Sequence, residues 1–164
     1  MPRRPDPDVE RRILDAAWKL WKGGDQRLSL RILARAARTN TPAIYRRFKN
    51  RGEIVRAMLL RVRHDLDEAI SPAPSMEAAV DPYLDFALSR PRQYELFFAH
   101  QHELRPWLPG PKSAHREKNP VRFWGRDRLA EELGGPPEGH LALAVMIWAV
   151  VHGTASLLIS RQSI

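Results

Sequence analysis

Cysteine is absent from the 164 residues. Its absence excludes disulfide scaffolds, cysteine-ligated zinc sites, cysteine nucleophiles and thiol redox switches. Lysine is scarce, with only five Lys among the 27 basic residues. The excess of arginine favours bidentate contacts to phosphate or guanine. The first residues are polar and lack the apolar segment of a secretory signal, so we expect a cytoplasmic protein.

Signals of β-structure are also lacking. The sequence shows no strand-like alternation of apolar and polar residues and no Asn-Gly or Asp-Gly hairpin turn. Apolar residues recur instead at helical spacing, interrupted by Pro and Gly clusters. This pattern predicts helices near residues 7–22, 29–37, 40–48, 50–70, 76–89, 92–104, 120–133 and 138–160. Asp81-Pro82 either kinks the fifth helix or restarts it.

The positive charge is concentrated in the first third of the chain. The net charge is +8, yet residues 1–51 hold 14 Lys and Arg against 5 Asp and Glu, while residues 52–164 are nearly neutral. Such asymmetry is typical of a polyanion-binding module joined to a neutral one. A solvated basic face without a partner is the competing interpretation.

Residues 29–51 have the lengths and connections of a helix-turn-helix. On a helical wheel of 40–48, Ile44 and Phe48 point toward the core, and Pro42, Ala43, Arg46 and Lys49 point away. Thr41, Tyr45 and Arg47 lie on the flanks. Small residues at a helix start and Arg, Lys and Tyr beyond it suit base edges and phosphates. A surface helix with a charged wet side would show the same periodicity.

Three helix starts carry capping residues. Ser29 and Asn40 are good N-caps for the second and third helices, and Pro42 is tolerated in a first turn. Asn50-Arg51-Gly52-Glu53 is a capping-box pattern with Asn in the first position.

Three stretches, Ile13–Ala17, Ser29–Ala37 and Ile44–Arg51, resemble the N-terminal domain of TetR-family transcriptional regulators. Tyr45 with Phe48, followed by a basic residue that opens the next helix, is the most specific part of this resemblance. Trp148–Gly153 contains a Trp-His-Gly sequence similar to that of one group of TetR C-terminal domains. Those domains are helical, form homodimers and often enclose a small-molecule pocket.

The resemblance implies a role for each matching position. Thr41, Pro42 and Arg46 would face bases in the major groove. Phosphate contacts would come from a second set of residues, namely Ser29, Arg31, Tyr45, Lys49 and Arg51. Arg3 and Arg4 would form an arm on the DNA, and Leu33, Ala37, Ile44 and Phe48 would belong to the core.

One position departs from the family pattern. The turn between the second and third helices usually contains Gly, and Ala37-Arg38-Thr39 stands there in this chain. Either Arg38 adopts a left-handed conformation, at a cost of about 1 kcal/mol, or the turn differs and the third helix is tilted.

The last predicted helix is strongly apolar. Leu141–Val151 are eleven consecutive apolar residues, and no charge follows until Arg161. A membrane span needs about 20 apolar residues, and His152, Gly153, Thr154 and Ser156 interrupt this run. A monomer core helix is possible. A helix buried by its own domain on one side and by a second copy on the other fits best.

Several side chains in the C-terminal part invite a functional interpretation. Aromatic residues at helical spacing are more often plain core, but the family resemblance makes a ligand pocket an equal alternative, with five candidate residues: Phe97, Phe98, Trp124, Trp148 and His152. Tyr94, Trp107 and Phe123 are further aromatic residues there. His100 and His102, with Glu103 and His115, lack the i,i+4 spacing of a helical metal site, so we expect no metal.

We therefore expect an all-α protein with a helix-turn-helix DNA-binding domain at 1–52 and a helical-bundle ligand-binding and dimerisation domain at 53–164. The expected function is a ligand-responsive repressor that binds a palindromic DNA operator as a homodimer, with a small apolar ligand, no cofactor, no membrane and no catalytic residues. Two alternatives stay open. One is a helical adaptor that binds polyanions or acidic partners non-specifically. The other is an enzyme that uses His152 or the 100–103 cluster.

Overall fold

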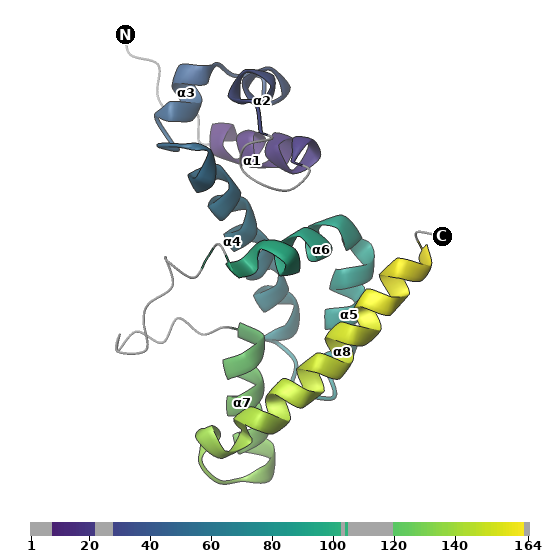
Figure 1. The fold of residues 1–164 in the computed structure, drawn as a ribbon. Helices are drawn as coiled ribbons and strands as arrows, with labels where there is room; N and C mark the ends of the chain where they lie inside the picture. Colours follow the sequence, from purple (N-terminus) through teal and green to yellow (C-terminus); the bar gives the residue numbers. More distant parts are fainter. Residues whose placement is uncertain (1–7, 22–27, 103, 105–119, 163–164) are drawn as a thin grey trace. The chain divides into compact units, whose positions relative to one another are not determined.

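In the computed structural model, the described residues are 8–21, 28–102, 104 and 120–162, with the side chains of 120–123 left aside. All regular elements within these ranges are helical (Figure 1). The α-helices are α1 (Asp8–Leu20), α2 (Leu30–Ala36), α3 (Thr41–Tyr45), α4 (Arg51–Ile70), α5 (Val80–Ser89), α6 (Pro91–His100), α7 (Pro120–Leu133) and α8 (Leu141–Gln162), and η3 (Pro137–His140) is a 3-10 turn. The predicted all-α fold class is confirmed.

The chain forms two compact units. Unit 1 covers Met1–Arg61 and unit 2 covers Val62–Ile164. Unit 1 therefore contains α1, α2, α3 and the first eleven residues of α4, and unit 2 contains the rest of α4 and the remaining helices. The boundary between the units falls within a helix, whereas the sequence alone suggests a division at residue 52.

The core of unit 1 is assembled from the inner faces of its four helices. The largest of its fully buried side chains are Ile13, Trp21, Leu28, Leu33, Ile44, Ile54, Met58 and Leu59. Trp18 and Trp21 meet edge to face with ring centroids 5.8 Å apart. Ala37 and Phe48, which the sequence assigns to the core together with Leu33 and Ile44, are buried as well.

The turn from α2 to α3 has the geometry of a Schellman motif. Arg38 adopts a left-handed conformation with φ 51°. The amide of Thr39 donates to the carbonyl of Ala34 at 2.9 Å, and the amide of Arg38 donates to that of Arg35 at 3.2 Å. These two bonds satisfy carbonyls that the end of α2 would leave free. Of the two expectations for this turn, the left-handed Arg38 is the one that the structure adopts.

The caps of α3 and α4 follow the sequence, but that of α2 does not. The Asn40 side chain accepts a hydrogen bond from the Ala43 amide at 2.8 Å, and the Asn50 side chain accepts from the Glu53 amide at 2.9 Å. Glu53 in turn accepts from the Lys49 amide at 2.7 Å. Ser29 occupies the N-cap position of α2, yet its hydroxyl makes no capping bond.

Three predicted helices are shorter than the sequence indicates. One of them, α6, ends at His100 instead of residue 104. α3 ends at Tyr45 instead of Phe48, and its last bonds continue as a turn in which Phe48 donates to the carbonyl of Ile44 at 2.9 Å. α5 begins at Val80 instead of Met76. Pro82 lacks an amide proton and is tolerated in a first turn, so Asp81-Pro82 restarts the helix and does not kink it.

The core of unit 2 forms where α5 and α7 pack along α8 (Figure 1). Met76, Leu129 and Ala144 make up its buried centre, with Trp124 and Ile147 packed against them. Gly125 allows α7 to approach closely, because a Cβ there would lie 3.3 Å from the Met76 sulfur and 3.5 Å from the Ala144 methyl.

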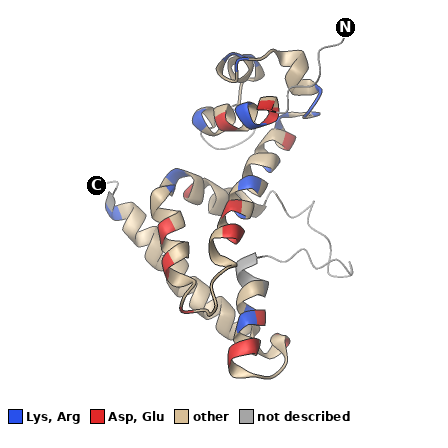
Figure 2. Ribbon diagram, turned by 180° about the vertical axis from the view of Figure 1, so that it is seen from behind, with Lys and Arg blue, Asp and Glu red and all other residues tan. Residues whose placement is uncertain are grey.

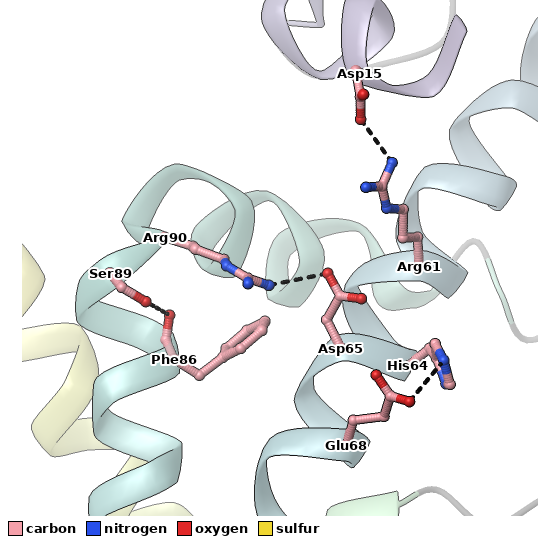
Figure 3. A network of polar contacts seen from close by, with 8 residues as sticks. All are labelled: Asp15, Arg61, His64, Asp65, Glu68, Phe86, Ser89 and Arg90. Carbon is pink, nitrogen blue, oxygen red and sulfur yellow. Dashed lines mark hydrogen bonds and ion pairs between the residues drawn. The ribbon is translucent and has the colours of Figure 1, made fainter. Parts of the chain in front are cut away.

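Ion pairs hold α4 within each unit (Figure 3). In unit 1, Arg61 binds Asp15 of α1 at 2.7 Å. In unit 2, Asp65 accepts from Arg90 at 3.0 Å, and the Arg90 guanidinium also lies 5.2 Å from the centre of the Phe86 ring. The α4 helix therefore carries one anchoring side chain for each unit.

Helix α8 leaves a stripe of large apolar side chains exposed. Met146, Val150 and Leu157 are 66%, 70% and 69% exposed, and Leu143 extends the same face at 39%. In Figure 2 the helix carries almost no coloured positions, which reflects its lack of charge. Pro137–Arg161 is long and apolar enough to cross a membrane by length and composition alone, with a mean hydropathy of 2.0 and 17% of it buried. A single helix of this kind is weak evidence for a membrane span, because a core helix of a soluble protein passes the same test.

Candidate nucleic-acid interface

Helix α3 presents a short polar face to solvent. Pro42 and Arg46 are exposed and Thr41 is partly exposed, while Ile44 is fully buried. Ala43 is only 6% exposed, so its predicted place on the outer face is wrong. Its methyl group is buried beside Ile44, because a wider face of α3 packs against the core than the helical wheel of residues 40–48 predicts.

A basic hollow adjoins α3, defined by Leu30, Tyr45, Lys49, Asn50, Arg51 and Gly52, with a volume of about 410 Å³. It brings together the start of α2, the end of α3 and the start of α4. Figure 2 shows Lys and Arg, in blue, in the link between α3 and α4. Tyr45 is 54% exposed, and Lys49 and Arg51 are exposed beside it. Three side chains assigned to phosphate contacts thus line one concave surface.

The remaining two assigned residues lie at the start of α2, on either side of Leu30. Arg31 is exposed, and Ser29 is partly exposed with its hydroxyl not used in a cap. Sequence reasoning missed Ile32, an isoleucine that is 54% exposed on the same helix. In the sequence, Ile32 follows the charged Arg31 and precedes Leu33 and Ala34, which form the buried face of the helix. This position is the only sequence signal that could have predicted an exposed isoleucine. Arg3 and Arg4 lie outside the described residues.

In unit 2, three of the five candidate pocket residues meet in one aromatic cluster. Phe98 lies 4.3 Å from His152 and 6.1 Å from Trp148, and the Trp148 and His152 rings stack at 5.1 Å between centroids. Phe97 is buried and packs against Phe98 at 5.0 Å. Trp124 lies on α7. Trp124 and Trp148 both line a neighbouring cavity, which we call the indole cavity.

This indole cavity is partly open to solvent. It offers about 30 Å³ to water-sized groups, and the whole concavity, open solvent included, encloses about 330 Å³. Trp124 and Trp148 are the only predicted pocket residues that line it. Its walls are Ile70, Met76, Ala79, Val80, Tyr83, Trp124, Ile147, Trp148 and Val151. Phe97, Phe98 and His152 are not among the lining residues.

The cluster contains a polar network that the sequence does not reveal. The Tyr94 hydroxyl lies 2.5 Å from Nδ1 of His152, and the Tyr83 hydroxyl lies 3.0 Å from the Tyr94 hydroxyl and 3.3 Å from the same nitrogen. We call these three residues the hydroxyl–imidazole network. They come from α5, α6 and α8, so no spacing along the chain could have brought them together.

Burial keeps the network in its neutral forms. It lowers the pKa of His152, and it raises the pKa of Tyr83 to about 12 against smaller lowering effects of Tyr94 and Trp148. The pKa of Tyr94 is also raised, first by burial and then by Tyr83. A neutral imidazole accepts at one ring nitrogen and donates at the other, so the Tyr94 hydroxyl donates to Nδ1 in the tautomer that carries its proton on Nε2.

The histidines near the end of α6 do not form a ligand set in the described part of the chain. His100 and His102 stack with ring centroids 6.2 Å apart. Among the described residues, no group of three His, Cys, Asp or Glu side chains is placed to hold a metal ion. Glu103, Trp107 and His115 lie outside the described residues, as does the side chain of Phe123.

A short helix with an exposed polar face, set against α2 by a tight turn and followed by a basic hollow, defines a helix-turn-helix DNA-binding protein. The pattern of the bacterial regulatory proteins of the tetR family matches residues 13–58, and that of a tetracyclin repressor-like C-terminal domain matches residues 76–163, more than half of the chain. The chain belongs to the TetR family of transcriptional regulators.

A solved structure supports the same fold. It is described as a "putative regulatory protein SCO4313", has a TM-score of 0.72 and 22% sequence identity, and the match covers 99% of this chain and 89% of that one. No curated protein matches the sequence significantly. The family resemblance stated from the residues is confirmed, and with it the role of the chain as a DNA-binding regulator.

Proposed function

We propose that the protein is a ligand-responsive repressor that binds a palindromic operator as a homodimer. The observation that carries the DNA-reading part is the basic hollow beside α3. Tyr45, Lys49 and Arg51 line it together, and the exposed Pro42 and Arg46 extend from the adjoining helix. Phosphates in the hollow fix the register, and Thr41, Pro42 and Arg46 read base edges.

The exposed stripe of α8 supports the homodimer. Met146, Val150 and Leu157 recur on one face, and large apolar side chains in such a row are costly to leave in water. Thr154 and Ser156 donate to carbonyls one turn back, at 2.9 Å each, so their hydroxyls are satisfied inside an interface. Pairing α8 with its copy would set two reading heads on successive major grooves, about 34–36 Å apart.

The aromatic cluster and the indole cavity support the ligand step. A small apolar molecule that enters this part of unit 2 would bind one arrangement of the dimer better than another and so release DNA. The step is tested by titrating candidate ligands onto a preformed protein–operator complex. DNA affinity unchanged by every ligand, with the apo protein bound to its operator, would contradict it.

The operator itself comes from selection of random duplex DNA by the purified protein at near-physiological salt. Enrichment of a palindrome supports a dimeric repressor, and enrichment of a single half-site contradicts dimeric reading. Capture of DNA without any motif favours the non-specific adaptor. Recovery of the protein in the membrane fraction would refute a soluble dimer.

Two variants test the assignment of roles. Arg46→Ala should cost about 1–3 kcal/mol on the operator and relax the preference at one base position. Arg51→Ala should weaken binding to all sequences alike and flatten the salt dependence. Arg92→Ala, which removes an exposed charge from α6 in unit 2, is the matched control and should change neither. Wild-type affinity of both test variants would show that the reading face is misassigned.

A further inference from the structure

Two buried hydrogen-bond donors in unit 2 have no acceptor. The indole nitrogens of Trp124 and Trp148 are both shielded from solvent, and within the described residues neither finds a hydrogen-bond partner. A buried N–H without an acceptor is rare and costs about 1–3 kcal/mol. Both residues line the indole cavity, one from α7 and the other from α8.

From this arrangement we infer that unit 2 binds an uncharged, largely apolar molecule whose oxygen acceptor is received by the indole N–H groups of Trp124 and Trp148. The inference rests on the proposed ligand-responsive function and specifies the chemical class of the effector. A ketone, an ester or an ether fits this description. A carboxylate does not, because none of the residues that line the cavity carries a charge.

The size of the cavity agrees with the binding of a small acceptor group. About 30 Å³ accommodates one oxygen-sized group, and the surrounding concavity of about 330 Å³ leaves room for a ring or a short chain at its mouth. Met76 forms part of the wall, and its unbranched side chain can shift to admit a ligand. Tyr83 and Ala79 also line this space.

The hydroxyl–imidazole network leaves the two indoles as the available donors. Tyr83 and Tyr94 already bond each other and His152. The Trp148 indole lies near enough to the Tyr83 oxygen to contribute to lowering the Tyr83 pKa, yet among the described residues its N–H meets no acceptor at hydrogen-bond distance and angle. An acceptor atom of a ligand would therefore give a hydrogen-bond partner to the indole N–H groups of Trp124 and Trp148.

The test compares two isosteric probes, acetophenone and α-methylstyrene, which differ by a carbonyl oxygen against a methylene group. Protein labelled with ¹⁵N at the indole nitrogens gives one signal for each of its five tryptophans. Acetophenone should bind in the millimolar range and move the Trp124 and Trp148 signals downfield. Trp18, on α1 in unit 1, should not respond. α-Methylstyrene should leave both signals in place, and benzoate should bind at least tenfold more weakly.

Single Trp→Phe variants assign the signals and measure each donor. Trp124→Phe and Trp148→Phe should each weaken acetophenone binding about three- to tenfold, the equivalent of one hydrogen bond. Trp18→Phe is the control and should leave binding unchanged. The comparison of the two probes on the wild-type protein needs no variant, so a folding defect in either one leaves the test intact.

The outcomes separate this inference from the proposed function. Absence of any response at Trp124 and Trp148 overturns the inference and shows a cavity filled by water alone. Operator binding by the apo protein is a separate measurement, so this outcome leaves the DNA-binding part of the proposed function untouched. Equal responses to both probes also overturn it, because shape would then suffice. Downfield shifts with acetophenone but no release of operator support the site and refute the ligand-responsive step.

Discussion

The left-handed Arg38 leads to a prediction of increased stability. Arg38 has φ 51°, a conformation that costs a side chain with a Cβ about 1–2 kcal/mol and costs glycine nothing. Glycine also increases the conformational entropy of the unfolded chain, which lowers the free energy of unfolding by about 0.4–1 kcal/mol. The two backbone bonds of the turn do not involve the side chain, which is exposed. Arg38→Gly should therefore raise the free energy of unfolding by about 0.5–1 kcal/mol.

The assay is thermal and urea unfolding followed by circular dichroism. For a chain of this length the predicted gain corresponds to a rise in Tm of about 1–4 °C. Arg35→Gly is the matched control, because it removes the same exposed side chain inside α2, where φ is negative, and should cost about 1 kcal/mol. Arg38→Asn should fall between Arg38→Gly and the wild type. Equal losses of stability for Arg38→Gly and Arg35→Gly would refute the reasoning, since the side chain of Arg38 would then matter more than its backbone.

Three further predictions concern a helix cap and two titrating groups. Asn50→Ala should lower the free energy of unfolding by about 1 kcal/mol, because the amide of Glu53 loses its acceptor. Urea denaturation measures the loss, and an unchanged midpoint of unfolding would contradict the capping role of Asn50. Burial raises the pKa of Asp67 to about 6, with Arg63 and His64 opposing it, so its charged form destabilises the fold above that pH. With 32% of the side chain exposed, Asp67→Asn should gain on the order of 1 kcal/mol at pH 7 and nothing at pH 4, and a gain independent of pH would contradict this origin. Burial lowers the pKa of His152, so the folded state takes up fewer protons than the unfolded state and loses stability as the pH falls below about 6.5. His152→Gln should remove that part of the slope between pH 8 and 5 in denaturation curves, and a slope identical to that of the wild type would assign it to other groups.

Local features of unit 1 could be predicted from the sequence because their causes are local. Asn40 and Asn50 cap the helices expected of them, since a side-chain oxygen at an N-cap needs only the next turn of its own helix. The end of α3 could not be predicted. The bonds from Phe48 and Arg47 both go to the carbonyl of Ile44, and this tightening depends on how Phe48 is packed into the core.

Features of unit 2 that join distant segments were beyond the sequence. Phe98, Trp148 and His152 are all named as candidate pocket residues from the sequence, and the structure places them in one cluster, but Tyr83, which bonds His152, stands 69 residues earlier in the chain. A tyrosine in a helix with an apolar face gives no sign of which hydroxyl it will meet. The excess of positive charge in residues 1–51, in contrast, can be counted from the sequence alone, and it indicates the DNA-binding unit without any structure.

The position of the unit boundary inside α4 has a consequence for building chimeric regulators. Ile54, Val55, Met58 and Leu59 of α4 are fully buried and belong to unit 1, whereas Val62, Leu66 and Ile70 of the same helix are buried in unit 2. A junction placed at residue 52 would remove four of the 18 buried hydrophobic residues that unit 1 has in the described part of the chain. A splice between two regulators must therefore fall at Arg61 and keep the residue count of the helix, because one inserted residue turns every following side chain by about 100°.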